Sequence, residues 1–535
     1  MNIQKIFDAA LQDSRSGRFR QAEKKLLRLA KEPMNDHGAG SVYKLLGVVY
    51  ASTHKVTKAA KAFAIAAEKI PSDPSIYANL CNCLTLDGQF DDAVAAGQRA
   101  VALSPGSSDA HYNLADAFKL KGDLGGAVAH YRKTVEISPD VAAAHNSLGN
   151  VLWDSGDLDG AISSYRRALE ISPDLAIAHN NLGTALRNAG EPENAISSYL
   201  SALEIRPDMA IFRNNLGMAY RDINDLENAI ANFSQALEIQ PDFTSAFAQL
   251  GHAHRDGEKY DHAIEYYDRA DTGVARAEAL RCLYAAGKYD ELFDRIREQP
   301  DKYGTNIGAA AVCAYAAEQL GQENPHPFCP NPLDFLYFGK IDGYLADVDD
   351  FTETLIEELR TLPSVWNLIS TTTESGFQTR GNLFDQNSEN IRLLQDIIEK
   401  EIETYRSSFD EENCLFIKSW PAETDFNAWS VILRTNGHQS AHIHASGWLS
   451  GVVYLKLVAS DDKDEGAIIF GSDGYGYPLL NSDVAERLHR PEKGEIVLFP
   501  SSLFHRTVPI TRDGERIIVA FDLVPREQAP METEA

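Results

Sequence analysis

An interval of 34 residues organises the first half of this chain. Three further columns keep step with a recurring proline: a leucine usually followed by a small residue, an alanine, and in most units an aromatic residue. A repeat of roughly 20–50 residues indicates stacked units that share a continuous core, rather than one compact globule. The proline column consists of Pro71, Pro105, Pro139, Pro173, Pro207 and Pro241.

Each repeating unit has the pattern of two helices joined by a turn. Between Leu148 and Leu169, apolar residues follow helical spacing twice, with Gly156 between the two runs. The small residues allow close helix packing, the aromatic residue fills the gap, and the proline begins the next connection because it cannot continue a helix.

This pattern resembles the tetratricopeptide repeat. The resemblance implies an all-α superhelix over residues 1–321, with regular repeats at about 42–275. Degenerate units around Gly17–Leu29 and Leu280–Ile296 are expected to cap the array, and the second is expected to have a shortened first helix.

An amide side chain precedes the repeat leucine in most units. Because amides donate and accept hydrogen bonds at once, such a ladder suits sequence-tolerant binding of a peptide backbone. It is similar to the ladder of tetratricopeptide proteins that feed substrates to a glycosyltransferase domain, so we expect a groove that binds a protein or peptide. Alternatively, these amides cap or pack locally. The amides predicted to bind peptide are Asn79, Asn113, Asn181 and Asn215.

The composition changes at residues 322–333. Four prolines there predict a stiff linker and a domain boundary. Helices are expected over Val348–Leu362 and Ile391–Tyr405, and from residue 415 short β-branched and aromatic runs predict an antiparallel barrel or sandwich within residues 334–525. Residues 526–535 are expected to be disordered. The prolines are Pro325, Pro327, Pro330 and Pro332.

Histidine and arginine residues mark a candidate site in this second region. Asn436–Gly437 predicts a turn, and the predicted strand Gln439–His444 follows it. His442 and His444 lie one residue apart in this strand, so both imidazoles are expected on one face. With His505 from another strand they would leave open coordination positions, which a redox-active Fe(II) requires. Arg516 begins the closing strand and could hold a carboxylate with its planar guanidinium.

Together these motifs resemble the 2-oxoglutarate and Fe(II)-dependent oxygenases of the double-stranded β-helix fold. The HxH pair is followed by SGVVYL at Ser450–Leu455 and by GEIVLFPSSLFH at Gly494–His505. Upstream, Gly376–Thr379 and Asn382–Phe384 resemble the bacterial branch that is often fused to tetratricopeptide repeats. The resemblance spans residues 331–524 and implies an α+β jelly-roll domain.

The resemblance also implies the cofactors and their ligands. Fe(II) would be held by His442 and His505, with 2-oxoglutarate as cosubstrate and O2 as oxidant. Arg516 would pair with the far carboxylate of 2-oxoglutarate.

One position departs from the family pattern, because His444 stands where an Asp or Glu ligand is usual. Three histidines, or two histidines and water, suit iron chemically. The missing carboxylate leaves the site more positive, so another metal or an inactive barrel is an alternative. Asp473 or Glu465 could supply a carboxylate, and His438 is a nearby competitor that we interpret as a loop residue.

Arg516 also has alternatives. It could form a surface ion pair with Asp513 or Glu515, and Arg434 is a second candidate carboxylate anchor. Two aromatic residues are expected to pack in the barrel rather than touch substrate: Trp448 and Tyr454.

Composition limits the partners. The chain has 78 acidic and 50 basic residues, and this net charge of -28 argues against nucleic acids and anionic membranes, although it also favours solubility. No stretch approaches the roughly 18 apolar residues of a membrane helix. The six cysteines form no CxxC pair, which favours a reducing, cytoplasmic location.

The sequence therefore predicts an Fe(II)- and 2-oxoglutarate-dependent dioxygenase that hydroxylates a protein or peptide captured by the repeats. One alternative is a non-catalytic interaction scaffold with a silent or metal-binding barrel. Another is a small-molecule oxygenase whose repeats serve oligomerisation.

Overall fold

The computed structural model describes residues 3–366, 372–379, 381–458, 464–471, 476–481 and 485–526. The chain forms two compact units, residues 1–241 and 242–535. The second unit contains the last helical hairpins together with all of the β-strands that the described residues form.

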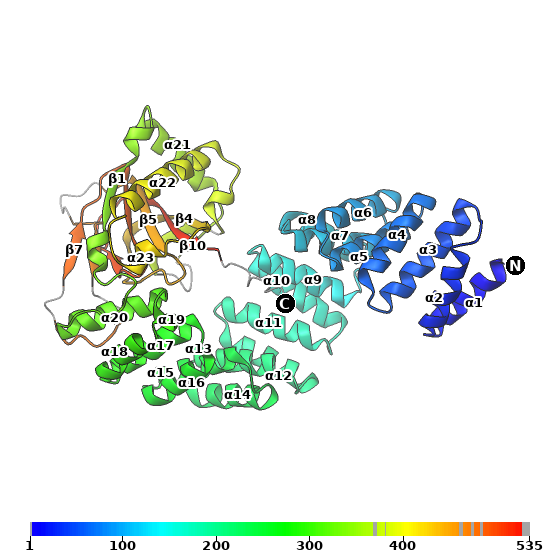
Figure 1. Ribbon diagram of the computed structural model, residues 1–535, viewed down its shortest axis with the longest axis horizontal. Coiled ribbons are helices and arrows are strands. Elements are labelled where there is room, and N and C mark those ends of the chain that lie inside the picture. The colour runs from blue at the N-terminus through cyan, green and yellow to red at the C-terminus, as the bar shows by residue number, and fades with distance from the viewer. Residues whose placement is uncertain are drawn as a thin grey trace. The chain divides into compact units, whose positions relative to one another are not determined.

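The first unit consists of antiparallel helical hairpins stacked side by side (Figure 1). Each hairpin corresponds to one predicted repeat, which confirms the tetratricopeptide architecture. The helices are α1 (Ile3–Arg15), α2 (Phe19–Leu29), α3 (Asp36–Ala51), α4 (Val56–Lys69), α5 (Pro74–Leu86), α6 (Phe90–Leu103), α7 (Ser108–Lys121), α8 (Leu124–Ile137), α9 (Ala142–Asp154), α10 (Leu158–Ile171), α11 (Ala176–Asn188), α12 (Pro192–Ile205), α13 (Ala210–Asp222) and α14 (Leu226–Ile239).

The glycine and aromatic columns explain how closely the two helices of a hairpin pack. A Cβ atom on Gly183 would lie 2.8 Å from the ring of Tyr199, and one on Gly149 would lie 2.5 Å from the ring of Tyr165. Both rings are buried. Only glycine leaves room for a ring at this distance, so the two columns determine the hairpin geometry together.

The second unit begins with further hairpins. The expected shortening of the first helix in the last repeat is wrong: α17 has 13 residues, whereas α16 before it has only 11. Asp271 ends α16 in a left-handed conformation with φ of 46°, and the Thr272 side chain then caps α17. The helices are α15 (Thr244–Asp256), α16 (Tyr260–Ala270), α17 (Gly273–Ala285), α18 (Tyr289–Glu298), α19 (Pro300–Tyr303) and α20 (Ile307–Leu320).

Two antiparallel sheets follow, as expected for a double-stranded β-helix. The larger sheet has the strand order β1-β8-β5-β10-β4-β3-β2 and the smaller one β7-β6-β9. The strands are β1 (Tyr337–Lys340), β2 (Ser364–Trp366), β3 (Thr373–Thr379), β4 (Thr424–Gln439), β5 (Leu449–Lys456), β6 (Ile468–Gly471), β7 (Glu486–His489), β8 (Glu495–Pro500), β9 (His505–Thr507) and β10 (Arg516–Pro525).

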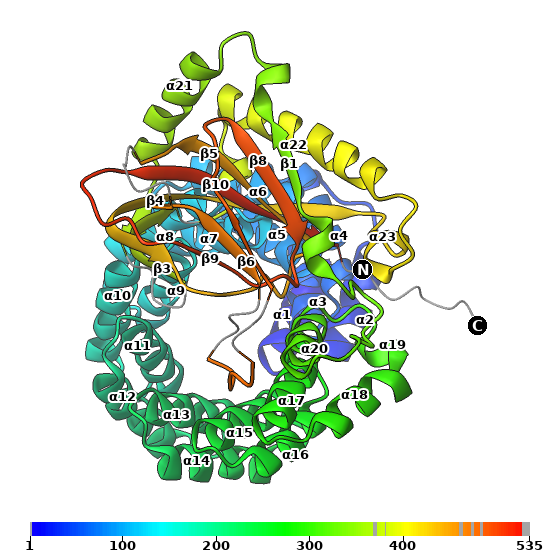
Figure 2. The same ribbon diagram turned by 90° about the vertical axis from the view of Figure 1, so that its left-hand side faces the viewer.

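Helices cover one face of the larger sheet. Figure 2 shows α22 (Glu389–Ser408) lying across this sheet on the side away from β6 and β9. The helical layer also includes α21 (Val348–Thr361) and α23 (Leu415–Lys418), and it confirms the predicted helical support.

Strand β10 shows how the two faces of the sheet are separated. Ile517 and Val519 belong to the core beneath the helices, whereas Ile518 and Ala520 belong to the core inside the barrel. Because side chains alternate along a strand, residues 516 and 522 share the inner face with residues 518 and 520.

Two local predictions around the histidines are wrong. Strand β4 runs through the predicted turn at Asn436–Gly437, where Asn436 has φ of 66° and its N–H donates to the Ile510 carbonyl at 2.5 Å. A left-handed residue with a cross-strand partner distorts a strand without reversing it. The strand ends at Gln439, so His442 forms a single bridge with His505 instead of lying in a continuous strand.

Residues 322–333 are irregular up to a short 3₁₀ turn that begins at Pro332. Phe328 and Cys329 are buried in the core beneath the helices, and the N–H of Phe416 donates to the Phe328 carbonyl at 2.8 Å. The boundaries predicted at 1–321, 322–333 and 334–525 stay predictions, and the tail from residue 527 lies outside the described residues. In the described part of the chain, no helix is long and apolar enough to cross a membrane.

Candidate metal centre

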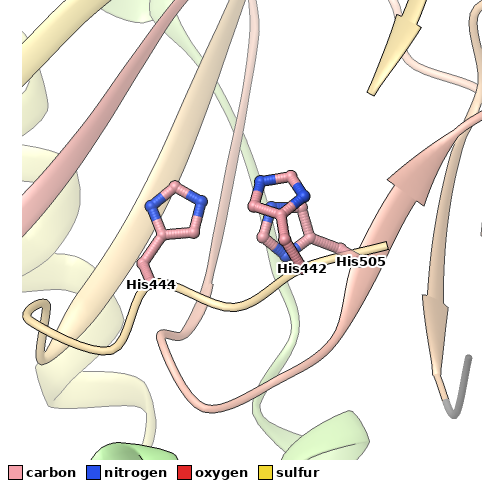
Figure 3. A group of neighbouring side chains, drawn as sticks. All are labelled: His442, His444 and His505. Atoms are coloured by element: carbon pink, nitrogen blue, oxygen red, sulfur yellow. The ribbon is translucent and has the colours of Figure 1, made fainter. Parts of the chain in front are cut away.

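Three histidines from two segments meet at one end of the barrel. His442 and His444 follow the end of β4, and His505 begins β9 (Figure 3). Each can offer one ring nitrogen such that the three nitrogens lie within 4.8 Å of one another. Reciprocal backbone hydrogen bonds of 3.0 Å join His442 and His505, so the spacing of their segments is set by the main chain.

The hydrogen bonds of the rings determine their tautomers. Nδ1 of His442 lies 2.7 Å from the Ser440 carbonyl oxygen, and Nδ1 of His505 lies 3.2 Å from that of Leu503. A carbonyl only accepts, so each Nδ1 carries the proton and each Nε2 keeps its lone pair. These two rings therefore have Nε2 available for a metal ion.

His444 has a different kind of partner. Its Nδ1 lies 2.7 Å from Oδ1 of Asp522, a buried carboxylate on β10. The same Oδ1 accepts a hydrogen bond of 2.7 Å from the Ser450 hydroxyl, which lies 2.8 Å from the hydroxyl of Ser501. This network leaves the Nε2 of His444 available as well.

Burial keeps the imidazole rings of His442 and His505 neutral. Burial, with a smaller contribution from neighbouring His444, lowers the pKa of His442 to about 4. Burial likewise holds the pKa of His505 well below its usual value, with His442 and His444 contributing. At neutral pH these imidazoles are unprotonated, which is the state that coordinates a metal.

Arg516 is buried and incompletely paired. Its Nη2 donates to the Tyr454 hydroxyl at 3.3 Å, while Nε and Nη1 are buried and have no hydrogen-bond partner in the described part of the chain. The residue is 1% exposed, so bulk solvent does not reach these N–H groups. A buried guanidinium with unpaired N–H groups suits a carboxylate ligand, and 2-oxoglutarate carries one.

The surface alternative for Arg516 is therefore wrong. Glu515 pairs instead with Arg360 at 2.7 Å and with Lys456 at 3.2 Å. Arg434, the second candidate anchor, is exposed and lies 3.7 Å from Glu515.

The other candidates do not join the three histidines. Glu465 accepts a hydrogen bond of 2.9 Å from the backbone of Thr511, and His438 lies 3.6 Å from Glu374. Asp473 lies outside the described residues.

The predicted peptide-binding amides are half-buried and donate hydrogen bonds within the array. Three of the four amides, Asn113, Asn181 and Asn215, donate to the preceding repeat, which is the local packing that the alternative expects. Peptide binding by these residues stays a prediction. Asn79 donates to the carbonyl of Ser75 at 2.7 Å, Asn113 to that of Ala78 at 3.0 Å, Asn181 to the Asn146 side chain at 3.2 Å and Asn215 to the Asn180 side chain at 2.9 Å.

A cavity of about 880 Å³ adjoins the histidine segment. Helices α17 and α20 contribute Arg281 and Gly308, and the barrel contributes Ile443, Ala445 and Tyr477. None of the three histidines lines it. The cavity therefore lies on the Ile443 side of this segment and is separate from the metal position.

Sequence reasoning missed Asp522 and the pairing of Tyr454 with Arg516. Asp522 lies an even number of residues after Arg516 on the predicted closing strand, so alternation places both on one face. Tyr454 was expected only to pack. Trp448 does pack: it is buried, and its Nε1 donates to the Phe416 carbonyl at 3.0 Å.

Comparison with known proteins finds separate matches for the repeats and for the C-terminal β-domain. Residues 427–522 match the family model described as "Putative 2OG-Fe(II) oxygenase". Tetratricopeptide repeat models match residues 7–74, 115–156, 149–190, 174–242 and 214–278. No curated protein matches the chain.

Several solved structures resemble part of the chain. YrrB, titled a TPR protein with an unusual peptide-binding site, is 26% identical over 35% of this chain and 96% of its own, with a TM-score of 0.31. MamA is 24% identical over 31% and 92%, with a TM-score of 0.30. PilF of Pseudomonas aeruginosa is 18% identical over 36% and 88%, with a TM-score of 0.33.

Proposed function

Because this chain joins tetratricopeptide repeats to a C-terminal domain of the "Putative 2OG-Fe(II) oxygenase" family, we propose that it is an Fe(II)- and 2-oxoglutarate-dependent dioxygenase acting on a protein or peptide. The repeats capture the substrate, and the barrel hydroxylates it. The buried, unpaired Nε and Nη1 of Arg516 carry the proposal, because they provide a site for a carboxylate inside the barrel that holds the histidines.

The donor set suits the proposed metal. Three imidazoles bind Fe(II) and leave open positions for further ligands. When bound, Fe(II), 2-oxoglutarate and O2 together supply oxidation of a C–H bond, with release of succinate and CO2. A three-histidine set also suits Zn(II), so the test must identify the metal.

The residues of the barrel have separate roles in this proposal. His442, His444 and His505 hold the metal through Nε2. Arg516 binds the far carboxylate of 2-oxoglutarate with its unpaired N–H groups. Tyr454 is fully buried and burial raises its pKa, so its phenol stays protonated and fixes the guanidinium from one side.

Stacked helical hairpins support the choice of a polypeptide substrate, since such arrays present extended surfaces to other chains. The half-buried amides keep carbonyl oxygens as potential acceptors beyond the N–H groups already used. In the small-molecule alternative the repeats would serve oligomerisation, so deleting them would leave turnover intact.

The test is anaerobic binding of Fe(II) and 2-oxoglutarate to the full chain, observed as the weak visible charge-transfer band of an iron–keto acid chelate. We expect the band in the wild type and its loss in His442→Ala and His505→Ala. Arg516→Ala should bind Fe(II) but need far more 2-oxoglutarate. Iron binding without the band would indicate another kind of metal site, and no binding of either would favour a non-catalytic scaffold.

The substrate class needs a second experiment. Wild-type protein and His505→Ala should capture the same polypeptides, but only the wild type should release succinate and add the mass of one oxygen atom to a captured chain. Succinate release that is unaffected by any polypeptide, and stimulated by a small molecule instead, would contradict the proposed substrate class.

A further inference from the structure

Asp522 has a position that the proposed metal ligands alone do not explain. It is the carboxylate behind His444, with a distance of 2.7 Å between Nδ1 and Oδ1, and it is 4% exposed. Iron sites of the facial-triad type use two histidines and one carboxylate as direct ligands. Here a histidine stands at the third position, and a carboxylate lies behind it.

We propose that Asp522 is a positioning residue that supplies the missing negative charge to the metal through His444. The inference rests on the proposed metal site and concerns how that site works without a carboxylate ligand. Asp522 holds the Nδ1 proton of His444, turns Nε2 towards the metal position and makes the imidazole a stronger donor.

The direction of the hydrogen bonds supports this role. A carboxylate only accepts, so the Ser450 hydroxyl must donate to Asp522, and the Ser501 hydroxyl must then donate to Ser450. For the same reason, Nδ1 of His444 must carry a proton. Two donors therefore converge on one oxygen of Asp522, and the network has a single consistent orientation.

The three histidines are supported unequally. His442 and His505 donate to backbone carbonyls, which are neutral, whereas His444 donates to a charged side chain. A carboxylate partner raises the basicity of a ligating imidazole more than a carbonyl does. The negative charge is therefore directed to the ligand at the position where a carboxylate would otherwise bind.

Packing around Asp522 keeps this arrangement rigid. A Cβ atom on Gly447 would lie 2.7 Å from the Ser501 hydroxyl and 3.1 Å from the Cβ of Asp522, so the turn after His444 packs directly on the network. The N–H of His444 also donates to the Ser501 carbonyl at 3.1 Å. The backbone and the side chain of His444 are thus fixed by the same neighbours.

The experiment is an anaerobic titration of the full chain with Co(II), followed by its visible absorption and compared among wild type, Asp522→Asn and Asp522→Ala. We expect Asp522→Asn to weaken Co(II) binding about 10–100-fold and to change the shape of the absorption band, because an amide keeps an acceptor but lacks the charge. Asp522→Ala should weaken binding at least as much.

A matched control is present in the same barrel. Glu495 is a buried carboxylate whose oxygen lies 2.9 Å from Nε2 of His489, which is not one of the three clustered histidines. Glu495→Gln removes the same kind of charge from the barrel core and should leave Co(II) affinity and the absorption band unchanged. Thermal unfolding of each variant without metal shows whether the fold is retained.

The outcomes separate this inference from the proposed function. Wild type that binds no Co(II) would overturn both. Wild-type affinity in Asp522→Asn would overturn the charge role alone, and loss only in Asp522→Ala would show that a neutral acceptor is enough. If the Asp522 variants do not fold, Ser450→Ala decides: several-fold weaker binding supports the inference, and unchanged binding overturns it.

Discussion

Removing the buried guanidinium of Arg516 should stabilise the barrel and strongly weaken cosubstrate binding at the same time. In the described part of the chain, Nε and Nη1 of Arg516 have no hydrogen-bond partner, and an unpaired buried donor costs about 1–3 kcal/mol, or more when charged. Arg516→Met alone would also leave the buried Tyr454 hydroxyl without its bond of 3.3 Å. The double variant Arg516→Met/Tyr454→Phe therefore removes both polar groups.

The expected magnitude follows from the burial. Replacing buried ionic groups with well-packed apolar side chains of similar volume is often neutral or stabilises a protein by about 1–4 kcal/mol, and the missing partners of Arg516 favour the stabilising end. Wild type should instead gain about 2.7 kcal/mol from 2-oxoglutarate at 100 times its Kd, and the double variant should gain little. For a unit of the size of residues 242–535, that gain raises the midpoint by about 4–5 °C.

The assay is thermal unfolding under argon with Fe(II), with and without 2-oxoglutarate. Arg434→Met is the control, because Arg434 is an exposed arginine of the same barrel and its loss should change neither midpoint. A double variant that is less stable than wild type, and that still shows the full shift with 2-oxoglutarate, would refute the reasoning.

Further predictions concern the array and its junction with the barrel. Gly183→Ala should lower the unfolding midpoint, because about 1–3 kcal/mol of overpacking outweighs a helix-propensity gain of up to about 1 kcal/mol. Gly125→Ala should raise the midpoint, because its Cβ would meet only the Asp123 carboxylate, at an ordinary contact distance of 3.6 Å. Asn181→Ala should lower the free energy of unfolding in urea by about 1 kcal/mol, because it removes hydrogen bonds between repeats. Unchanged stability would contradict a structural role for this amide and favour a role in peptide binding. Gln319→Met should accelerate amide hydrogen exchange in residues 476–481, and unchanged exchange would contradict the role of Gln319 there.

Periodicity made most of the fold predictable. The 34-residue repeat specified the hairpins because the small residue after each repeat leucine, such as Gly183, leaves room for a ring of the aromatic column. The β-branched run that follows Arg516 placed this residue correctly at the start of the last strand. The turn expected at Asn436–Gly437 was wrong because a left-handed asparagine serves a strand distortion as well as a hairpin, and only the cross-strand partner at Ile510 decides between them.

The clustering of the three histidines was predictable, but the residues that support them were not. The spacing of His442 and His444 and the family resemblance at His505 together indicated that these side chains converge, and metal binding by them stays a prediction. Asp522 could not be selected in the same way, because its role depends on which strand lies behind His444. Contacts between segments far apart in the sequence carry this information, and no local pattern contains it.

Within residues 242–535, the last helices of the array belong structurally to the barrel. The hydroxyl of Tyr284 donates to the Pro478 carbonyl at 2.7 Å, and the buried side chain of Gln319 accepts from two backbone N–H groups of the same segment. Tyr315 contacts the ring of Phe504, the residue next to His505. Deleting residues 1–321 would therefore remove the partners of these barrel residues as well as the repeats. Deleting only residues 1–241 would remove repeats and preserve these contacts. Loss of turnover in the shorter protein alone would reflect damage to the barrel, and loss in both would indicate substrate capture by the repeats.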